Sequence, residues 1–383
     1  MSNFGMACTA VLCLAGCTKT DGAVSGNASE TSAANASALM RDISPAEFVA
    51  DMGIGINIGN TLDSFYNGPG IAGETGWGNP KITRELITAI AGHGYRTIRL
   101  PVTWMEHLGP APDYRVEDAW MARVTEVVNW CLDEGLYVIV NLHHDGAGDT
   151  ECWIQKAAED SDTVIEQFTV LWTQIAAAFV GAPDHLVFEA MNEVGFDSMP
   201  YGEAQKLLTR LNQTFVDTVR QSGGNNSRRF LLVSGYFTDI DRTCDSFYRL
   251  PQDTQNRLML SVHYYGPSTF CIAEKPDNSW GFRGDWGTDA DYAELTAQFN
   301  KLRTKFTGQG VQGMQGIPVI LGEYGVVKNE YKDEASRIAW MKAVMRTALE
   351  YGMCPVLWDT GGELSRRAPY AMSESLRSIM NEQ

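Results

Sequence analysis

The chain has 383 residues, of which 44% are hydrophobic, 20% charged and 10% aromatic, so it has the material for a large core and is neither disordered nor collagen-like. Lysine and arginine total 30 against 47 aspartate and glutamate, and the net charge of −17 argues against nucleic acid or anionic lipid as a partner. The length allows two or three domains, or one α/β barrel that takes up most of the chain.

The N-terminus has the pattern of a targeting segment. Residues 6–17 form an apolar run that is too short to cross a membrane as a helix and is typical of a signal peptide. The run ends in Leu14-Ala-Gly-Cys17, which resembles the lipobox of bacterial lipoproteins, where cleavage precedes an acylated cysteine. We expect residues 1–17 to be a lipoprotein signal peptide and Cys17 to anchor a secreted protein to a membrane, at the cell surface or in the periplasm. The alternative is an unprocessed leader without a role.

The segment after this leader is low in complexity. Residues 18–39 are mostly Ser, Thr, Ala, Asn and Gly without apolar periodicity, which predicts a flexible spacer. Five cysteines follow it, an odd number without zinc-ligand spacing. In an oxidising compartment one pair among Cys152, Cys244 and Cys271 is able to form a disulfide, and we favour Cys244 with Cys271.

Eight runs with β character recur along the rest of the chain, at residues 53–60, 97–102, 137–144, 186–193, 230–236, 258–265, 318–324 and 354–359. Their nearly continuous apolar character is typical of strands buried on both faces of a parallel sheet. The runs recur about every 43 residues, which leaves room for a strand, a loop, a helix and a second loop.

Helical patterns lie between these runs. Residues 117–134, 202–222 and 334–351 each carry an apolar stripe and end before a glycine, as helices often do. Eight strand–helix units predict an α/β fold, a (β/α)8 or TIM barrel, as one catalytic domain over residues 40–383. A doubly wound open sheet is the competing fold, but no Gly-x-Gly-x-x-Gly motif follows the first run.

Polar residues gather at the predicted strand ends, where barrel enzymes build their active sites. They are Asn57 and Asn60, Arg99, His143 and His144, Asn192 and Glu193, His263 and Tyr265, Glu323, and finally Trp358. A single polar residue at a strand end is as often an ordinary surface residue as a site residue. Charged groups at most strand ends together are harder to explain without a site, because crowding them at one barrel mouth costs desolvation energy.

Two carboxylates, Glu193 and Glu323, end the fourth and seventh runs and are expected to face each other across the mouth. Breaking an acetal requires one carboxylic acid to protonate the leaving oxygen and one carboxylate to act at the anomeric carbon. Arg99 or Tyr265 beside Glu323 would favour its ionised form, as a nucleophile requires. Glu193 would then keep a proton near neutral pH and serve as acid and base in turn.

Seven ordered segments carry a resemblance to a known family. They are Gly59-Asn-Thr-Leu-Asp63, Glu74-Thr-Gly-Trp-Gly-Asn-Pro80, Ile98-Arg-Leu-Pro-Val102, Asn141-Leu-His-His144, Ala190-Met-Asn-Glu193, His263-Tyr-Tyr265 and Gly322-Glu-Tyr324. In order, spacing and strand placement the chain from about residue 42 to its end resembles the family 5 glycoside hydrolases, particularly the subgroup of bacterial endo-β-1,4-glucanases and xyloglucanases.

The resemblance implies a retaining, endo-acting β-1,4-glucanase that cleaves cellulose-like, mixed-linkage or xyloglucan chains by double displacement. It implies Glu193 as acid/base and Glu323 as nucleophile. The implied supporting and substrate-binding residues are Arg99, His143, Asn192, His263, Tyr265 and Trp358, the last as a platform under a sugar. Strand alternation sends His143 and His144 to opposite sides, and we expect His143 to point inward. Asn60 and Trp77 are further candidates for sugar contact, with a turn or a loop anchor as their alternative roles.

Other functions remain open from the sequence. An endo-β-1,4-mannanase would use the same two carboxylates, and a non-catalytic surface glycan-binding lipoprotein would keep only the cleft. No metal or other cofactor is expected, because adjacent histidines on a strand do not easily bind one ion and no zinc motif occurs. We expect a monomer whose partner is a β-glucan polysaccharide and which reaches the membrane only through Cys17.

Overall fold

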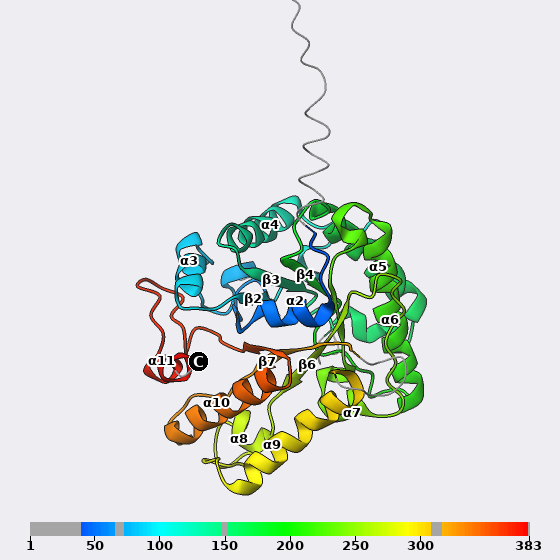
Figure 1. Cartoon of the computed structure of the whole chain (residues 1–383). Coiled ribbons are helices and arrows are strands. Elements are labelled where there is room, and N and C mark those ends of the chain that lie inside the picture. Colours follow the sequence, from blue (N-terminus) through cyan, green and yellow to red (C-terminus); the bar gives the residue numbers. More distant parts are fainter. Residues whose placement is uncertain (1–39, 66–72, 147–151, 308–315, 382–383) are drawn as a thin grey trace, which may run out of the picture.

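The computed structural model of the protein describes residues 40–65, 73–146, 152–307 and 316–381. Eight parallel strands close into a barrel, each paired with its neighbours in sequence and the last with the first (Figure 1). They are β1 (Gly55–Asn57), β2 (Thr97–Leu100), β3 (Tyr137–Asn141), β4 (Leu186–Glu189), β5 (Leu231–Ser234), β6 (Leu258–Tyr264), β7 (Val319–Tyr324) and β8 (Cys354–Leu357). The predicted TIM barrel is confirmed.

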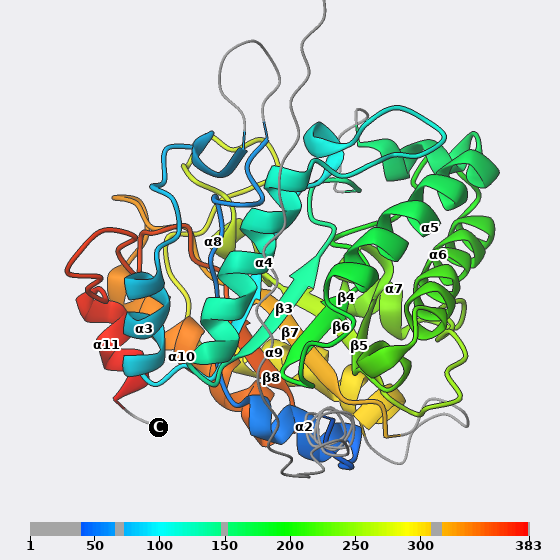
Figure 2. The same cartoon turned by 90° about the horizontal axis from the view of Figure 1, so that it is seen from above.

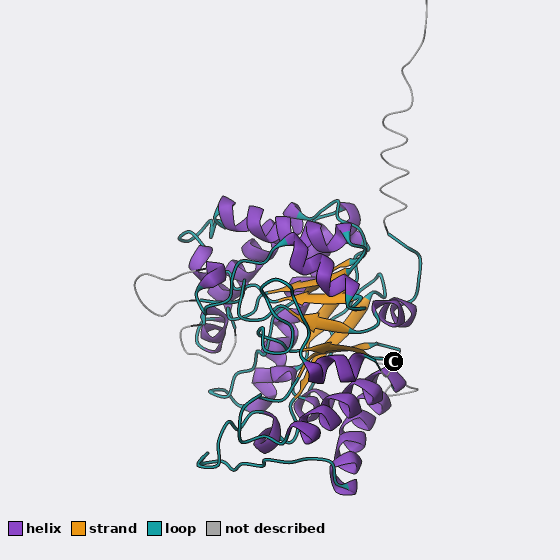
Figure 3. Ribbon diagram, turned by 90° about the vertical axis from the view of Figure 1, so that its left-hand side faces the viewer, coloured by secondary structure: helices purple, strands orange, loops and turns teal. Residues whose placement is uncertain are grey.

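Helices enclose the barrel (Figure 3). In the described part of the chain they are α2 (Pro45–Met52), α3 (Arg84–Gly92), α4 (Asp118–Asp133), α5 (Ser161–Ala178), α6 (Tyr201–Gln221), α7 (Ile240–Cys244), α8 (Ser268–Cys271), α9 (Asp289–Leu302), α10 (Glu334–Glu350) and α11 (Glu374–Met380). The three helices predicted from apolar stripes are α4, α6 and α10, each within one residue of its expected bounds. Their buried stripes form the layer between the helices and the barrel.

The strands are shorter than the apolar runs suggested. β3 ends at Asn141 rather than residue 144, β4 at Glu189 rather than 193, and β8 at Leu357 rather than 359. The reason is that the last residues of each run leave the hydrogen-bonded ladder and turn over the barrel mouth. The candidate site residues of these runs therefore lie just beyond the strands, where side chains are no longer bound to strict alternation.

The interior of the barrel changes from apolar to polar along its axis. At the end where the strands begin, the interior is filled by buried apolar side chains such as Tyr137, Val187 and Ile320. Two residues further along the same inner face lie polar side chains, among them Glu189, which is fully buried. Because inward-facing residues recur every second position in a strand, this polar layer sits directly beneath the site.

Helix α2 covers the end of the barrel opposite the site (Figure 2). It begins with a capping box in which Ser44 and Glu47 bind each other's backbone N–H groups, and Pro45 takes the first helical position. Its Phe48 is fully buried and stacks on Phe230 with ring centroids 3.9 Å apart. The helix thus seals the apolar end of the barrel.

We expect Phe48→Ala to lower the free energy of unfolding by about 3 to 5 kcal/mol, because it removes a buried ring and leaves a cavity at the barrel floor. Urea denaturation followed by circular dichroism measures the loss. Phe247→Ala is the matched control, since that ring is 54% exposed. A loss below about 1 kcal/mol for Phe48→Ala would mean that α2 is not part of the core.

The favoured disulfide is wrong. Cys244 and Cys271 are both free, as is Cys152. Cys244 is the last residue of α7, and Cys271 is the last residue of α8. The predicted signal peptide (1–17) and spacer (18–39) lie outside the described residues. Among the residues that the structure does describe, no helix has the length and apolar character needed to cross a membrane.

Candidate active site

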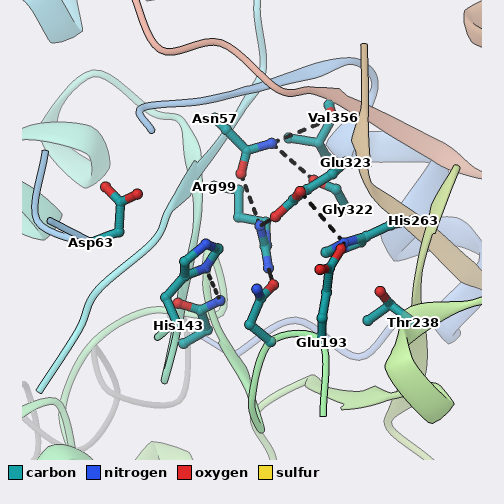
Figure 4. Close-up of polar contacts among 12 residues, drawn as sticks. Asn57, Asp63, Arg99, His143, Glu193, Thr238, His263, Gly322, Glu323 and Val356 are labelled. Atoms are coloured by element: carbon teal, nitrogen blue, oxygen red, sulfur yellow. Dashed lines mark hydrogen bonds and ion pairs between the residues drawn. The ribbon is translucent and has the colours of Figure 1, made fainter. Parts of the chain in front are cut away.

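The candidate residues converge at the carboxyl end of the barrel around Arg99 of β2 (Figure 4). This guanidinium is fully buried and is held from several sides. One terminal nitrogen, Nη1, donates to Glu323 Oε1 at 2.7 Å and to Asn57 Oδ1 at 3.0 Å. The other, Nη2, donates to Asn192 Oδ1 at 2.9 Å. Arg99 therefore fixes residues from three other strands or their ends in one arrangement.

The remaining nitrogen of Arg99, Nε, donates to Glu189 Oε2 at 2.7 Å. Glu189 also accepts from Ser261 Oγ at 2.6 Å and from Asn141 Nδ2 at 3.1 Å. Sequence reasoning missed Glu189 and Ser261. The signal that was available is strand alternation, since Glu189 stands two residues after the inward-facing Val187 in an otherwise apolar run.

The two predicted catalytic carboxylates lie close together. Tyr265 donates its hydroxyl to Glu323 Oε2 at 2.9 Å. His263 Nδ1 lies 2.7 Å from Glu193 Oε1 and 3.5 Å from Glu323 Oε2, so it faces both carboxylates. One oxygen of Glu193 and one of Glu323 lie within 4.8 Å of each other. Glu193 remains 40% exposed at the mouth, whereas the side chain of Glu323 is 7% exposed.

The pKa directions of the two carboxylates differ from those expected from the sequence. Burial raises the pKa of Glu323, although His263 and Arg99 oppose this. Burial also acts to raise the pKa of Glu193, but the hydrogen bond and charge of His263 outweigh it and lower this pKa. The expected order is reversed because burial and the neighbouring charge of Glu193 raise the pKa of Glu323, and because Glu193, not Glu323, is the closer partner of His263.

Hydrogen bonds fix the orientation of two neighbouring side-chain amides. Asn192 accepts from Arg99 through Oδ1, so its Nδ2 is the donor that remains for a ligand. Asn141 Oδ1 accepts from the backbone N–H of Val102, so its Nδ2 donates to His143 Nδ1 at 3.2 Å. The hydrogen of the neutral His143 ring is then on Nε2. Burial, followed by the charges of His144 and Arg99, lowers the pKa of His143 well below its usual value.

His143 and His144 do not point to opposite sides as expected. Their ring centroids lie 4.6 Å apart, because both residues follow the end of β3 and escape strand alternation. His144 packs its ring against Phe65 and Trp77, at centroid distances of 5.0 and 5.2 Å. Burial lowers the pKa of His144 to about 4, so it is neutral near pH 7. Trp77 is 39% exposed, so this group of three rings is partly accessible from solvent.

Trp358 and Asn60 complete the predicted set. The Trp358 indole lies parallel to the His143 ring, with an interplanar angle of 3° and centroids 5.7 Å apart. Gly59 backs the indole so closely that a Cβ there would come within 2.9 Å of it. Asn60 has a φ of 57° and donates its backbone N–H to Asp63 Oδ2 at 3.0 Å. The structure thus gives Asn60 its alternative role in a turn.

A cavity of about 340 Å³ adjoins Glu193 on the side away from His143, lined in part by Phe237, Thr238 and Tyr265. Phe237 and Thr238 both have positive φ values, 50° and 52°, which is rare for residues other than glycine. The sequence held no signal for this wall, because its position depends on the backbone of the loop after β5. Thr238 lies beside Glu193 (Figure 4).

Two clusters in the described residues bring metal-ligand atoms within 4.8 Å of one another, Glu193 with His263 and Glu323, and Asp63 with His143 and His144. In the first, His263 Nδ1 contacts both carboxylates. In the second, Asp63 accepts the backbone N–H groups of Asn60 and Thr61, and its pKa is raised by burial to about 6. These contacts account for both clusters without an ion, and metal independence stays a prediction.

Comparison with known proteins gives consistent matches. The family model described as cellulase (glycosyl hydrolase family 5) matches residues 62–363. Endoglucanase A of Paenibacillus barcinonensis is 37% identical over 346 residues, which cover 84% of each chain. The structure of a GH5-4 broad specificity endoglucanase from an uncultured bovine rumen ciliate is 36% identical, with a TM-score of 0.79 over 88% of this chain and 97% of that one.

A second solved structure is that of a family 5 xyloglucanase from Paenibacillus pabuli in complex with a ligand. It is 35% identical, with a TM-score of 0.78 over 87% of this chain and 98% of the other. The family model covers the strand ends from β2 to β8, and the two solved structures align with 87% or more of this chain.

Proposed function

The chain belongs to glycoside hydrolase family 5 and is an endo-β-1,4-glucanase of that family, and from this premise we propose that it cleaves its substrate with retention, using Glu323 as nucleophile and Glu193 as acid/base. The observation that carries this proposal is the pair of carboxylate oxygens within 4.8 Å. Retaining glycosidases hold their carboxyl groups roughly 5 to 5.5 Å apart, whereas inverting ones need roughly 6.5 to 9.5 Å to admit a water.

In the first step Glu323 attacks the anomeric carbon while the bond to the leaving sugar breaks, and Glu193 gives its proton to the leaving oxygen. Arg99 and Tyr265 hold the Glu323 oxygens for this attack. A bound sugar covers the exposed side of Glu193 and removes water from it. This desolvation raises the pKa of Glu193, so that the proton lies on the acid Glu193 rather than on the nucleophile Glu323.

In the second step a water attacks the sugar that is esterified to Glu323, and Glu193 takes a proton from that water. Esterification removes the negative charge of Glu323, so Glu193 is stable as a carboxylate at this stage. His263 donates to Glu193 and favours that ionised form. We assign Asn192 Nδ2 and His143 Nε2 to hydrogen bonds with the hydroxyls of the reacting sugar.

The product anomer tests the proposal. A retaining enzyme releases β-configured reducing ends at first, which then mutarotate, and proton NMR during the first minutes of cello-oligosaccharide hydrolysis distinguishes them from α ends. Initial release of the α-anomer would overturn the assignment of Glu323 as nucleophile.

For the substrate we propose a β-1,4-glucan of broad type, including xyloglucan and mixed-linkage glucan. Support comes from the relatives, one described as a broad specificity endoglucanase and another as a xyloglucanase. The mannanase and the non-catalytic binder are set aside, since the chain is an endoglucanase. Initial rates on carboxymethyl cellulose, xyloglucan, barley glucan and mannan measure which of these polysaccharides the enzyme cleaves. Activity on carboxymethyl cellulose alone would contradict the proposed substrate range.

Trp358 is the proposed platform under the sugar next to the cleaved bond. We expect Gly59→Ala to displace the indole, because the new Cβ would lie 2.9 Å from two of its ring atoms. The loss of stacking should lower kcat/KM on cello-oligosaccharides by about 5- to 150-fold, which corresponds to about 1 to 3 kcal/mol for stacking on an aromatic ring. Gly92→Ala is the control, since a Cβ there meets nothing within 4 Å. An unchanged kcat/KM in Gly59→Ala would contradict the platform role.

We also propose that the protein is a lipoprotein anchored at Cys17, as the sequence Leu14-Ala-Gly-Cys17 suggests. Growth of an expressing strain with labelled palmitate tests this. Label should appear on the wild type and be absent from Cys17→Ser, and equal label on both would contradict the anchor.

A further inference from the structure

One carboxylate of the site cannot reach a substrate. Glu189 lies beneath Arg99 and is fully buried, and Arg99 Nε is 2.7 Å from its Oε2. Arg99 Nη1 lies at the same distance, 2.7 Å, from Glu323 Oε1. A single guanidinium is therefore placed between two carboxylates, one in the polar inner layer and one facing the cleft.

Donors surround Glu189 on both oxygens. Ser261 Oγ donates to Oε1, while Arg99 Nε and Asn141 Nδ2 both donate to Oε2. The Asn141 amide is not free to flip, because its Oδ1 accepts from the backbone N–H of Val102. Such a set of donors suits a carboxylate anion, and burying a charge of this kind is costly unless it is paired.

We propose that Glu189 is a positioning residue that fixes Arg99 and balances its charge, so that Arg99 orients the nucleophile Glu323 without making it a weak base. The inference rests on the proposed role of Glu323. A full positive charge against Glu323 would stabilise its anion before the reaction, and this stabilisation is lost as the anion becomes an ester. A guanidinium already paired with Glu189 supplies the hydrogen bond with much less of that penalty.

The raised pKa of Glu323 agrees with this charge balance, since burial prevails there although Arg99 is in contact. The other ionisable groups around Glu323 and its neighbours Arg99, Glu193 and His263 come from four further parts of the barrel mouth. They are Asp63 after β1, His143 and His144 after β3, Glu193 after β4, and His263 and Tyr265 of β6 and its end. A change confined to residue 189 leaves all of them in place.

Glu189→Gln isolates the charge, because the glutamine can keep the hydrogen bonds. Its carbonyl oxygen replaces Oε2 and accepts from Arg99 and Asn141, and its NH2 group replaces Oε1 and donates to Ser261 Oγ, whose hydroxyl is able to rotate. Ser261→Ala is the matched control, since it disturbs the same buried cluster without changing its charge. Thermal unfolding by circular dichroism verifies that both variants are folded.

The readout is kcat/KM against pH on 2,4-dinitrophenyl β-cellobioside. Its leaving group needs no acid, so the acidic limb reports the ionisation of the nucleophile in the free enzyme. We expect the acidic limb of Glu189→Gln to move down by about one pH unit, as for a carboxylate that gains an unbalanced cation, and the plateau to fall a few-fold. Ser261→Ala should keep the acidic limb of the wild type.

An unmoved or upward-shifted limb in folded Glu189→Gln, or an equal shift in Ser261→Ala, overturns the charge-balancing role. If Glu189→Gln does not fold, the wild type decides: an acidic limb above the ordinary glutamate value of 4.5 supports the inference, and one below it overturns it. Failure of the proposed function is distinguishable, because Glu323→Ala would then still hydrolyse the aryl cellobioside.

Discussion

Glu323→Ala is expected to abolish hydrolysis of β-glucan, with kcat lowered at least about 10⁴-fold, because no other carboxylate is in place to form the covalent intermediate. The fold should survive, since the substitution removes a repulsive neighbour of Glu193. External azide should restore turnover of an aryl cellobioside by entering the space that Glu323 vacates. Azide attacks there on the α face, so the product is the α-cellobiosyl azide, which NMR identifies.

Glu350→Ala is the control for Glu323→Ala. It removes an exposed carboxylate at the end of α10, remote from the mouth, and should retain the wild-type rate. A β-cellobiosyl azide from Glu323→Ala would mean that the roles of the two carboxylates are exchanged. Residual hydrolysis of β-glucan within about tenfold of the wild type would mean that the nucleophile is a different group.

The barrel and most of its mouth were predictable because each depends on local signals in the chain. Apolar runs with a regular spacing specify the strands, and the polar residue that ends a run must lie at the carboxyl edge of the sheet. Arg99, Glu193 and Glu323 were found by this argument alone. The resemblance to a family then supplied roles, which strand position by itself does not.

What the sequence did not reveal depends on contacts between distant strands. The role of Glu189 depends on its contacts with Arg99 and Ser261, which are 90 and 72 positions away in the chain. The order of the two carboxylate pKa values is a second case, because it depends on which carboxylate His263 approaches more closely. The placement of His143 and His144 is a third, since β3 ends at Asn141, two residues before the first of them and three before the second.

Glu193→Ala is expected to separate substrates by their leaving group. On β-glucan, whose leaving oxygen needs a proton, kcat/KM should fall by about 10³- to 10⁴-fold through loss of the general acid. On 2,4-dinitrophenyl β-cellobioside the first step needs no proton and should remain near the wild-type rate. The second step then lacks its base, so the glycosyl-enzyme accumulates and dinitrophenolate appears as a burst that stopped-flow absorbance resolves.

Azide completes the test of Glu193. The space left by its side chain lies on the β face of the sugar bound to Glu323, so azide should release the sugar as the β-cellobiosyl azide and convert the burst into steady turnover. This outcome is opposite in stereochemistry to that of Glu323→Ala, and the two variants check each other. Equal losses of kcat/KM on β-glucan and on the dinitrophenyl substrate would refute an acid role, because only a group that gives a proton to the leaving oxygen is sensitive to its basicity. Loss of folding is ruled out by the burst itself, since only an intact site forms the intermediate.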